Sequence, residues 1–117
     1  MPKVSHKERP IEERREEARA MIKEFPGRSC LYIEKSPNCE TLDNLSKKKY
    51  LVPNTISCDQ LMYIIRSRLV LKKEEALFFY VDKRMICGST QLGDLYKKYK
   101  DKDNFLYIKY ASENCFG

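Results

Sequence analysis

The sequence predicts an α+β fold, in which two pairs of strands lie on either side of a helix along the chain. Apolar residues recur at spacings of three, four and seven in three segments, which is the pattern of amphipathic helices. Between these segments, residues alternate in polarity or are apolar on both faces, which is the pattern of strands. The helices are expected at residues 11–25, 57–68 and 89–99, and the strands at 29–35, 47–53, 76–81, 85–87 and 104–110.

The N-terminal 25 residues are expected to form a helical extension. The first ten are polar and include the only histidine, His6, which is expected to be solvated. Pro10 would end or restart a helix, and Pro26-Gly27 would terminate the helix that follows. Five apolar residues fall on one face of that helix. They are Ile11, Ala18, Met21, Ile22 and Phe25.

A first strand hairpin with a long loop is expected after the extension. Leu31 and Ile33 share one face of the strand at 29–35. The other face, expected to be the wetter one, carries Cys30, Tyr32 and Glu34. The loop at 36–46 leads to the second strand, Lys47–Pro53, which would lie antiparallel to the first.

The central helix has a clear start signal in the sequence. Ser57 and Gln60 form a capping box, in which each side chain can satisfy a backbone N–H of the other residue. Leu61, Ile65 and Leu69 share one row and form the expected core face. Ile64 lies off that row, so it is expected to line a groove.

The second half of the chain holds the most hydrophobic strand. Residues 76–81 are apolar on both faces, which favours a central position in the sheet. Asp82-Lys83 would turn the chain into the short strand, and Ser89 or Thr90 would cap the last helix.

The order of these elements places two strand hairpins on either side of a helix. The last strand is free to lie parallel beside the first, which gives the β-grasp arrangement of ubiquitin with a helical extension at its N-terminus. At 117 residues the chain is long enough for one core. Residues 1–25 are expected to form the extension, 26–110 the ubiquitin-like β-grasp core, and 111–117 a flexible tail.

The composition limits the classes of function. The chain carries 23 Lys and Arg against 17 Asp and Glu, a net charge of +6 that suggests acidic partners. Basic and acidic residues are interleaved, so no nucleic-acid partner is expected. The longest apolar run, at residues 76–81, has only six residues, too few to span a bilayer.

The five cysteines lack any C-x-x-C pair, which favours free thiols in the reducing cytoplasm. Neither a metal nor a cofactor is expected. Cysteine catalysis would need a base, and His6 lies in a polar segment. We therefore expect no catalytic residue and no enzyme.

The stretch Lys47–Pro53 carries the clearest signal of a binding surface. Tyr50, Leu51 and Val52 put bulk on both faces of a short strand that begins after lysines and ends at a proline. Strands that end on proline are often edge strands, whose free backbone groups can accept another extended chain. Positive charge beside that edge suggests capture of an acidic, partly apolar peptide by strand addition. The alternative is an ordinary core strand with solvated lysines.

Motifs distributed over almost the whole chain resemble one family. The chain is similar to the GABARAP and microtubule light-chain group of ubiquitin-like autophagy modifiers. The residues that carry the resemblance are Pro10, Glu12-x-Arg14-Arg15, Pro26-x-Arg28, Glu34-Lys35-x-Pro37, Lys47–Pro53, Ile65-Arg66-x-Arg68, Ala76-Leu77-Phe78-Phe79, Leu95-Tyr96, Phe105-Leu106-Tyr107-Ile108-x-Tyr110 and the terminal aromatic-glycine pair.

The resemblance implies conjugation through Gly117. The glycine would be adenylated, passed as a thioester through an activating and a conjugating enzyme, and joined to phosphatidylethanolamine. A deconjugating cysteine protease would act on the same terminus. The protein would then be cytoplasmic, and anchored on autophagosomes or related vesicles after lipidation.

The resemblance also implies a groove for acidic aromatic-x-x-aliphatic motifs in cargo receptors and adaptors. The aromatic pocket would be lined by Glu17, Met21, Cys30, Lys49, Leu51 and Phe105. The aliphatic pocket would be lined by Tyr50, Val52, Pro53, Ile56, Leu61 and Ile64. Arg28, Lys47 and Arg68 would make polar contacts with the peptide.

Three features leave alternatives open. Relatives usually have proline where this chain has Cys30, and some have a second aromatic residue where it has Asn104, so the aromatic pocket would be altered. Relatives also commonly carry residues beyond the glycine, whereas this sequence stops at Gly117. The alternatives to a lipid-conjugated modifier are an unconjugated peptide- or cytoskeleton-binding adaptor, and a modifier of protein lysines.

Overall fold

The computed structural model describes residues 5–71 and 75–113. Every predicted helix and strand is present, and a short 3₁₀ helix precedes the first long helix. The elements are η1 (His6–Glu8), α1 (Ile11–Glu24), β1 (Arg28–Lys35), β2 (Lys49–Pro53), α2 (Cys58–Ser67), β3 (Leu77–Val81), β4 (Arg84–Met85), α3 (Leu92–Tyr99) and β5 (Leu106–Ser112).

The strands form one mixed sheet in the order β2-β1-β5-β3-β4. β1 and β5 are parallel, with Leu31 opposite Leu106, and the other neighbours are antiparallel. The arrangement is the predicted β-grasp, and β2 is an edge strand as expected. Asp82 and Lys83 both adopt positive φ in the turn between β3 and β4, as a tight hairpin requires.

The strand predicted to be central, β3, lies in the interior of the sheet but not at its middle. The centre of the sheet is β5, while β3 lies between β5 and the two-residue strand β4. Phe78 and Tyr80 point to a face that is only half-buried. Apolar residues on both faces therefore indicated an interior strand correctly, but not its place in the order.

Helices α2 and α3 cover one face of the sheet and enclose the main core. The predicted capping box is present, because Gln60 N donates to Ser57 Oγ at 3.2 Å and Ser57 N donates to Gln60 Oε1 at 2.8 Å. The larger buried side chains of this core are Leu31, Ile33, Leu61, Ile65, Phe79, Leu92, Leu106, Ile108 and Tyr110.

The predicted cap of the last helix was wrong. Helix α3 begins after Gln91, which makes no side-chain cap, rather than after Ser89 or Thr90. Its first backbone donors are satisfied by the chain that follows β2. Leu92 N donates to Ile56 O at 2.8 Å, and the N–H of the next residue donates to the carbonyl of Asn54. A tertiary backbone contact thus replaces the side-chain cap.

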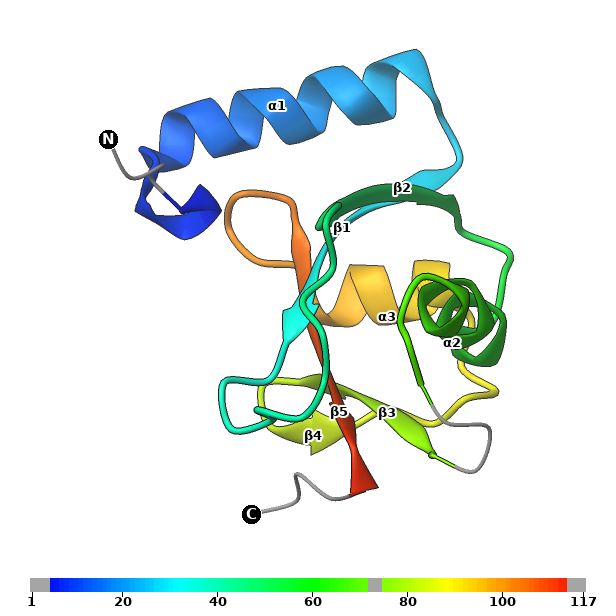
Figure 1. Cartoon of the computed structure of the whole chain (residues 1–117). Helices are drawn as coiled ribbons and strands as arrows, with labels where there is room; N and C mark the ends of the chain where they lie inside the picture. The colour runs from blue at the N-terminus through cyan, green and yellow to red at the C-terminus, as the bar shows by residue number, and fades with distance from the viewer. Residues whose placement is uncertain (1–4, 72–74, 114–117) are drawn as a thin grey trace.

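The opposite face of the sheet is covered by α1 and η1 (Figure 1). This corrects the prediction that Cys30 and Tyr32 lie on a wetter face, because they are 0% and 8% exposed. Both pack in a second, smaller core with Ala18 and Phe105. The alternation in β1 was read correctly, but the element that covers its second face lies elsewhere in the sequence.

Ion pairs fasten the extension to the sheet. Arg14 Nη1 lies 2.8 Å from Asp103 Oδ2, and Asp103 is fully buried. Asp103 also accepts hydrogen bonds from the hydroxyl of Tyr107 and from the backbone N–H of Phe105. In η1, Lys7 Nζ lies 3.3 Å from an Asp101 carboxylate oxygen.

The last strand is shifted toward the C-terminus relative to the prediction. Asn104 adopts a φ of 69° in a turn, so β5 begins at Leu106 rather than at 104. Ala111 and Ser112, expected in a flexible tail, are buried in β5 opposite Phe78 and Leu77. The tail can therefore begin only after Ser112.

The expectation of free thiols holds for three of the four described cysteines. Cys30, Cys58 and Cys87 are free. Cys39 is disulfide-bonded.

Candidate peptide-binding site

The candidate site is built around β2, one edge of the sheet. The strand pairs with β1 on one side, with Leu51 opposite Cys30 and Lys49 opposite Tyr32. No other strand in the described part of the chain pairs with its outer side. Alternation along β2 sends Tyr50 into the main core and Leu51 to the face under α1. The edge therefore has a different apolar cluster on each side.

Four residues predicted for the aromatic pocket lie in one cluster between α1 and β2. Cys30 and Phe105 are fully buried in it, and Met21 and Leu51 are half-buried against it. Cys30 Sγ lies 3.8 Å from Met21 Sδ. Burial raises the pKa of Cys30 to about 12, so the thiol is neutral and acts as an apolar group.

Glu17 and Lys49 join α1 to β2 at the rim of this cluster. Lys49 Nζ lies 2.8 Å from Glu17 Oε2, and Arg9 Nη1 lies 3.1 Å from Glu17 Oε1. Burial acts to raise the pKa of Glu17, but hydrogen bonds from Lys49 and Arg9 outweigh it and hold that pKa below its usual value. Glu17 is therefore a carboxylate, and an acidic ligand would compete with it for Lys49.

The residues predicted for the aliphatic pocket gather between β2 and α2. Tyr50, Val52 and Leu61 are buried together, and Ile56 packs against them. Ile64 is 38% exposed on α2, as expected for a residue off the core row. Pro53 is exposed at the end of the strand.

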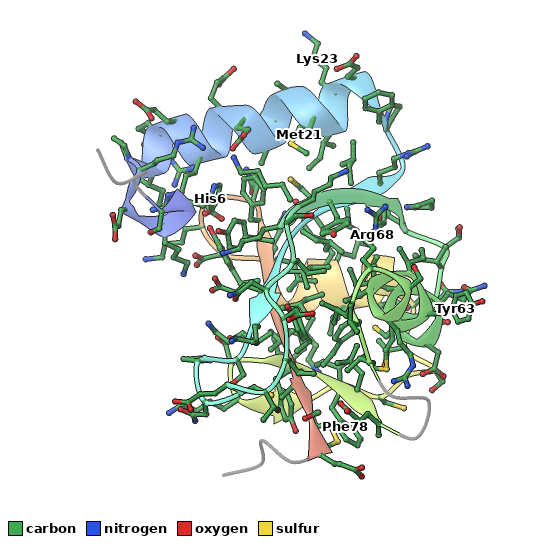
Figure 2. The ribbon with its side chains drawn as sticks, in the orientation of Figure 1. His6, Met21, Lys23, Tyr63, Arg68 and Phe78 are labelled. Carbon is green, nitrogen blue, oxygen red and sulfur yellow. The ribbon has the colours of Figure 1, made fainter. Side chains whose placement is uncertain are left out.

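The predicted polar contacts divide between the two ends of β2. Lys47 Nζ and Arg68 Cζ lie 5.1 and 5.7 Å from the centre of the Tyr50 ring. Figure 2 shows Arg68 directed toward β2 from the end of α2. Arg28 is at the other end of the strand, opposite Pro53, with its guanidinium over the ring of Phe25. Gly117 lies outside the described residues.

His6 was predicted to be solvated, and the structure shows that it is buried. The residue is 5% exposed, and its ring is stacked on Tyr32 at a centroid distance of 4.7 Å and edge-on to Phe105 at 4.5 Å. Figure 2 places it beneath the start of α1. Its Nδ1 lies 4.0 Å from Glu17 Oε1, so it belongs to the surroundings of the aromatic cluster. A lone histidine in a polar segment carries no sequence signal for this position.

Comparisons with known proteins agree with this geometry. Residues 13–117 match the family described as "Autophagy protein Atg8 ubiquitin like". The chain is also similar to Trypanosoma brucei ATG8, known from a crystal structure. The two share 35% sequence identity and a TM-score of 0.89, over 98% of this chain and 100% of that one. None of the helices in residues 5–71 and 75–113 has the length and apolar character needed to cross a bilayer.

Proposed function

Since this chain belongs to the Atg8 family of ubiquitin-like autophagy proteins, whose members are modifiers or adaptors and not enzymes, we propose that it recruits proteins by strand addition at β2 and is conjugated to phosphatidylethanolamine through Gly117. The ligand would be a short acidic segment with an aromatic-x-x-aliphatic motif. Recruitment and membrane attachment would use opposite parts of the chain, because β2 lies far from the C-terminal end of β5 in the sheet (Figure 1).

The single observation that supports recruitment most strongly is the outer edge of β2. An edge strand carries backbone N–H and C=O groups that another extended chain can pair. In the described residues no strand takes that place. Strand addition would let backbone hydrogen bonds supply affinity for any extended peptide, while side-chain pockets select among sequences.

The two clusters beside the strand would supply selection. An aromatic side chain would enter between Met21 and Leu51, above Cys30 and Phe105, and an aliphatic one would pack near Ile64. The floor of the first cluster is fully covered, so Met21, Leu51 or Lys49 would have to move aside. Opening that cluster costs free energy and so weakens binding. A net binding free energy of roughly −8 kcal/mol, which is a micromolar affinity, would be ordinary for such a peptide.

Lysine and arginine side chains would recognise acids that flank the motif. Lys47 is exposed, and Lys49 is half-buried through its ion pair with Glu17. A ligand carboxylate near Lys49 would replace Glu17 as its partner or bind the same ammonium group beside it. The attraction would favour binding, and no additional cation would be buried.

Peptide binding to variants of the two edge strands tests recruitment. We expect Leu51→Ala and Lys49→Ala each to weaken binding of a motif peptide roughly fivefold or more. Met85→Ala on β4, the opposite edge strand, is the matched control and should leave affinity unchanged. A peptide with N-methylated amides on its pairing side should fail to bind. Equal affinities of all variants, or full binding of the methylated peptide, would contradict strand addition at β2.

Conjugation is proposed for a different physical reason. Glycine lacks a Cβ, so an extended tail that ends in glycine can thread a narrow catalytic channel and expose its carboxyl carbon. A lipid with two acyl chains, at about 0.8 kcal/mol per buried CH₂, would supply the stable anchoring that one chain does not. The protein would be the substrate of this chemistry.

Reconstitution with the activating and conjugating enzymes, ATP and phosphatidylethanolamine liposomes tests conjugation. We expect intact mass to rise by the lipid less water, and Gly117→Ala to show no rise. A thioester without a lipid adduct would favour an acceptor such as a protein lysine. Absence of any thioester would leave the unconjugated adaptor as the better account.

A further inference from the structure

A groove between α1 and α3 concentrates most of the net positive charge of the protein. It has a volume of about 700 Å³ and extends from the middle of α1 to Asn104. The sequence shows no continuous basic stripe, because the residues that meet here come from α1, β1 and α3. The groove is lined by Arg19, Ile22, Lys23, Gly27, Arg28, Asn54, Thr55, Gln91, Gly93, Asp94, Tyr96, Lys97, Lys100 and Asn104.

The charges of this groove are unbalanced. Five of its side chains are cationic and one, Asp94, is anionic, whereas the whole chain has a net charge of only +6. Asp94 makes no ion pair within 4 Å with any of the five among the described residues. All five cationic side chains are exposed. Local charge of one sign in a concave surface raises the local concentration of anionic partners.

The floor of the groove is held in place by backbone hydrogen bonds. Gly93 N donates to Asn54 O at 2.9 Å, and Asn54 N donates to Gly27 O at 3.0 Å. A Cβ at Gly93 would lie 2.8 Å from the Cβ of Asn54, so the start of α3 and the end of β2 are in close contact. The floor of the groove is therefore held in position before any partner binds, which lowers the entropic cost of binding.

We propose that this groove binds an acidic peptide segment of a partner protein. The groove has cations on both sides, with Arg19 and Lys23 from α1 and Lys97 from α3. Figure 2 shows the Lys23 side chain reaching outward from α1. A row of solvated cations suits several carboxylates in sequence rather than one small anion, which needs a buried donor. Asn54, Gln91 and Asn104 place amide side chains beside the path of such a peptide backbone.

Two other polyanions fit the groove less well. Single-stranded nucleic acid needs exposed aromatic rings on which bases stack. The one aromatic ring in the groove, Tyr96, donates its hydroxyl to Asn104 O and has Lys100 Nζ 5.6 Å from its ring centre. A flat bilayer would meet the rim but not the floor formed by Gly27, Asn54 and Gly93.

The groove is also continuous with the edge of β2. Arg28 and Asn54 lie beside Pro53, where a peptide paired with β2 would leave the strand. Acids that continue from that end of a docked motif would therefore enter the groove. This continuity rests on the proposed function, whereas the charge and shape of the groove do not.

A pair of charge-matched double variants tests the proposal. Lys97→Glu/Lys100→Glu reverses two cations of the groove, and Lys98→Glu/Lys102→Glu makes the same change in net charge at exposed lysines outside it. The probe is a fluorescent ten-residue peptide rich in glutamate and free of aromatic residues, titrated at about 0.1 M salt. We expect the groove variant to bind roughly tenfold more weakly and the control to change less than about twofold.

The outcomes separate this proposal from its competitors. Equal loss in both variants would assign the binding to net charge, and no loss in either would place it elsewhere, so either result overturns the proposal. Selective loss of binding to an RNA oligonucleotide or to phosphatidylserine vesicles, with peptide binding retained, overturns the choice of partner. Binding of a motif peptide without flanking acids should be equal in both variants, so failure of the β2 site is detected independently.

Discussion

The face of the sheet under α2 and α3 and the face under α1 differ in what covers them. The first buries a large apolar core whose members include Leu31 and Tyr110. The second buries a smaller cluster around Cys30 and Phe105, and much of its cover is polar or charged. Its contacts include the buried Arg14–Asp103 pair, the carboxylate of Glu17 and the ring of His6.

We infer that the face under α2 and α3 supplies most of the stability of the fold, whereas the face under α1 supplies contacts that can change. Apolar burial carries no charge for salt to screen or for pH to change, whereas ion pairs respond to both. The proposed aromatic pocket lies on the second face, where Lys49 and Glu17 can exchange partners. A site that must open for a ligand thus lies on the face with the smaller apolar cluster, and the sheet and its main core hold it in position.

The largest effect is expected from truncation in the main core. Phe79 is 1% exposed on β3, so Phe79→Ala removes a ring from a close-packed site. We expect a loss of about 3–5 kcal/mol in the free energy of unfolding, measured by urea denaturation with an unchanged m-value. Phe79→Leu, the matched control, should lose much less. A loss below about 1 kcal/mol in Phe79→Ala would contradict a main core that is packed here.

A smaller and more local effect is expected from the ion pair under α1. Asp103→Asn leaves Arg14, whose side chain is 12% exposed, without its buried counter-charge. We expect a loss of about 2–3 kcal/mol, and faster amide hydrogen exchange in α1 than in α2. Arg19→Ala, which removes an exposed pair with Glu16 on the same helix, should cost less than about 0.5 kcal/mol. Equal acceleration of exchange in α1 and α2 would show that the two faces unfold as one unit.

The arrangement of the fold was predictable because its signals are local. Alternation of β1 side chains between the two faces, the capping box of α2 and the turn at Asp82-Lys83 each follow from neighbouring residues, and the structure has all three. The edge position of β2 was also predicted, from the proline that ends it. The two pockets beside β2 were predicted from the family resemblance. Side-chain periodicity alone does not distinguish residues that line a pocket from residues of the core.

The features that were missed depend on contacts between distant segments. Burial of His6 requires that η1 fold back onto Tyr32, and burial of Cys30 requires α1 above it. The start of α3 depends on the carbonyl of Ile56, which follows β2. The basic groove depends on side chains from α1 and α3, which are far apart in the sequence. No window of adjacent residues carries such information. The sequence therefore predicted a solvated His6, a wetter face at Cys30, and basic residues diluted by neighbouring acids.

The smallest expected effect is a dependence of the second face on pH. Burial lowers the pKa of His6 below its usual value, with the charge of Lys49 as the next contribution. Arg9 acts in the same direction, while the carboxylates of Glu17 and Asp103 oppose it. Both carboxylates are already paired, Glu17 with Lys49 and Arg9, and Asp103 with Arg14. Neither ring nitrogen of His6 has a hydrogen-bond partner among the described residues, and the Glu17 oxygen nearest to Nδ1 is 4.0 Å away, so burial of an imidazolium here is poorly compensated.

The sign of this dependence follows from the lowered pKa. The folded state favours the neutral ring, so the contribution of His6 to stability is present above the usual pKa of 6.5 and is lost as pH falls through the folded-state pKa. His6→Phe keeps an aromatic ring but removes the titration. Urea denaturation of both proteins between pH 7.5 and 5.5, where carboxylates with ordinary or lowered pKa values stay ionised, isolates the effect. We expect wild type to lose stability relative to His6→Phe as pH falls, with hydrogen exchange rising in α1 before α2. Parallel stability profiles would show that η1 accommodates the charge, and that the second face is no more sensitive to pH than the first.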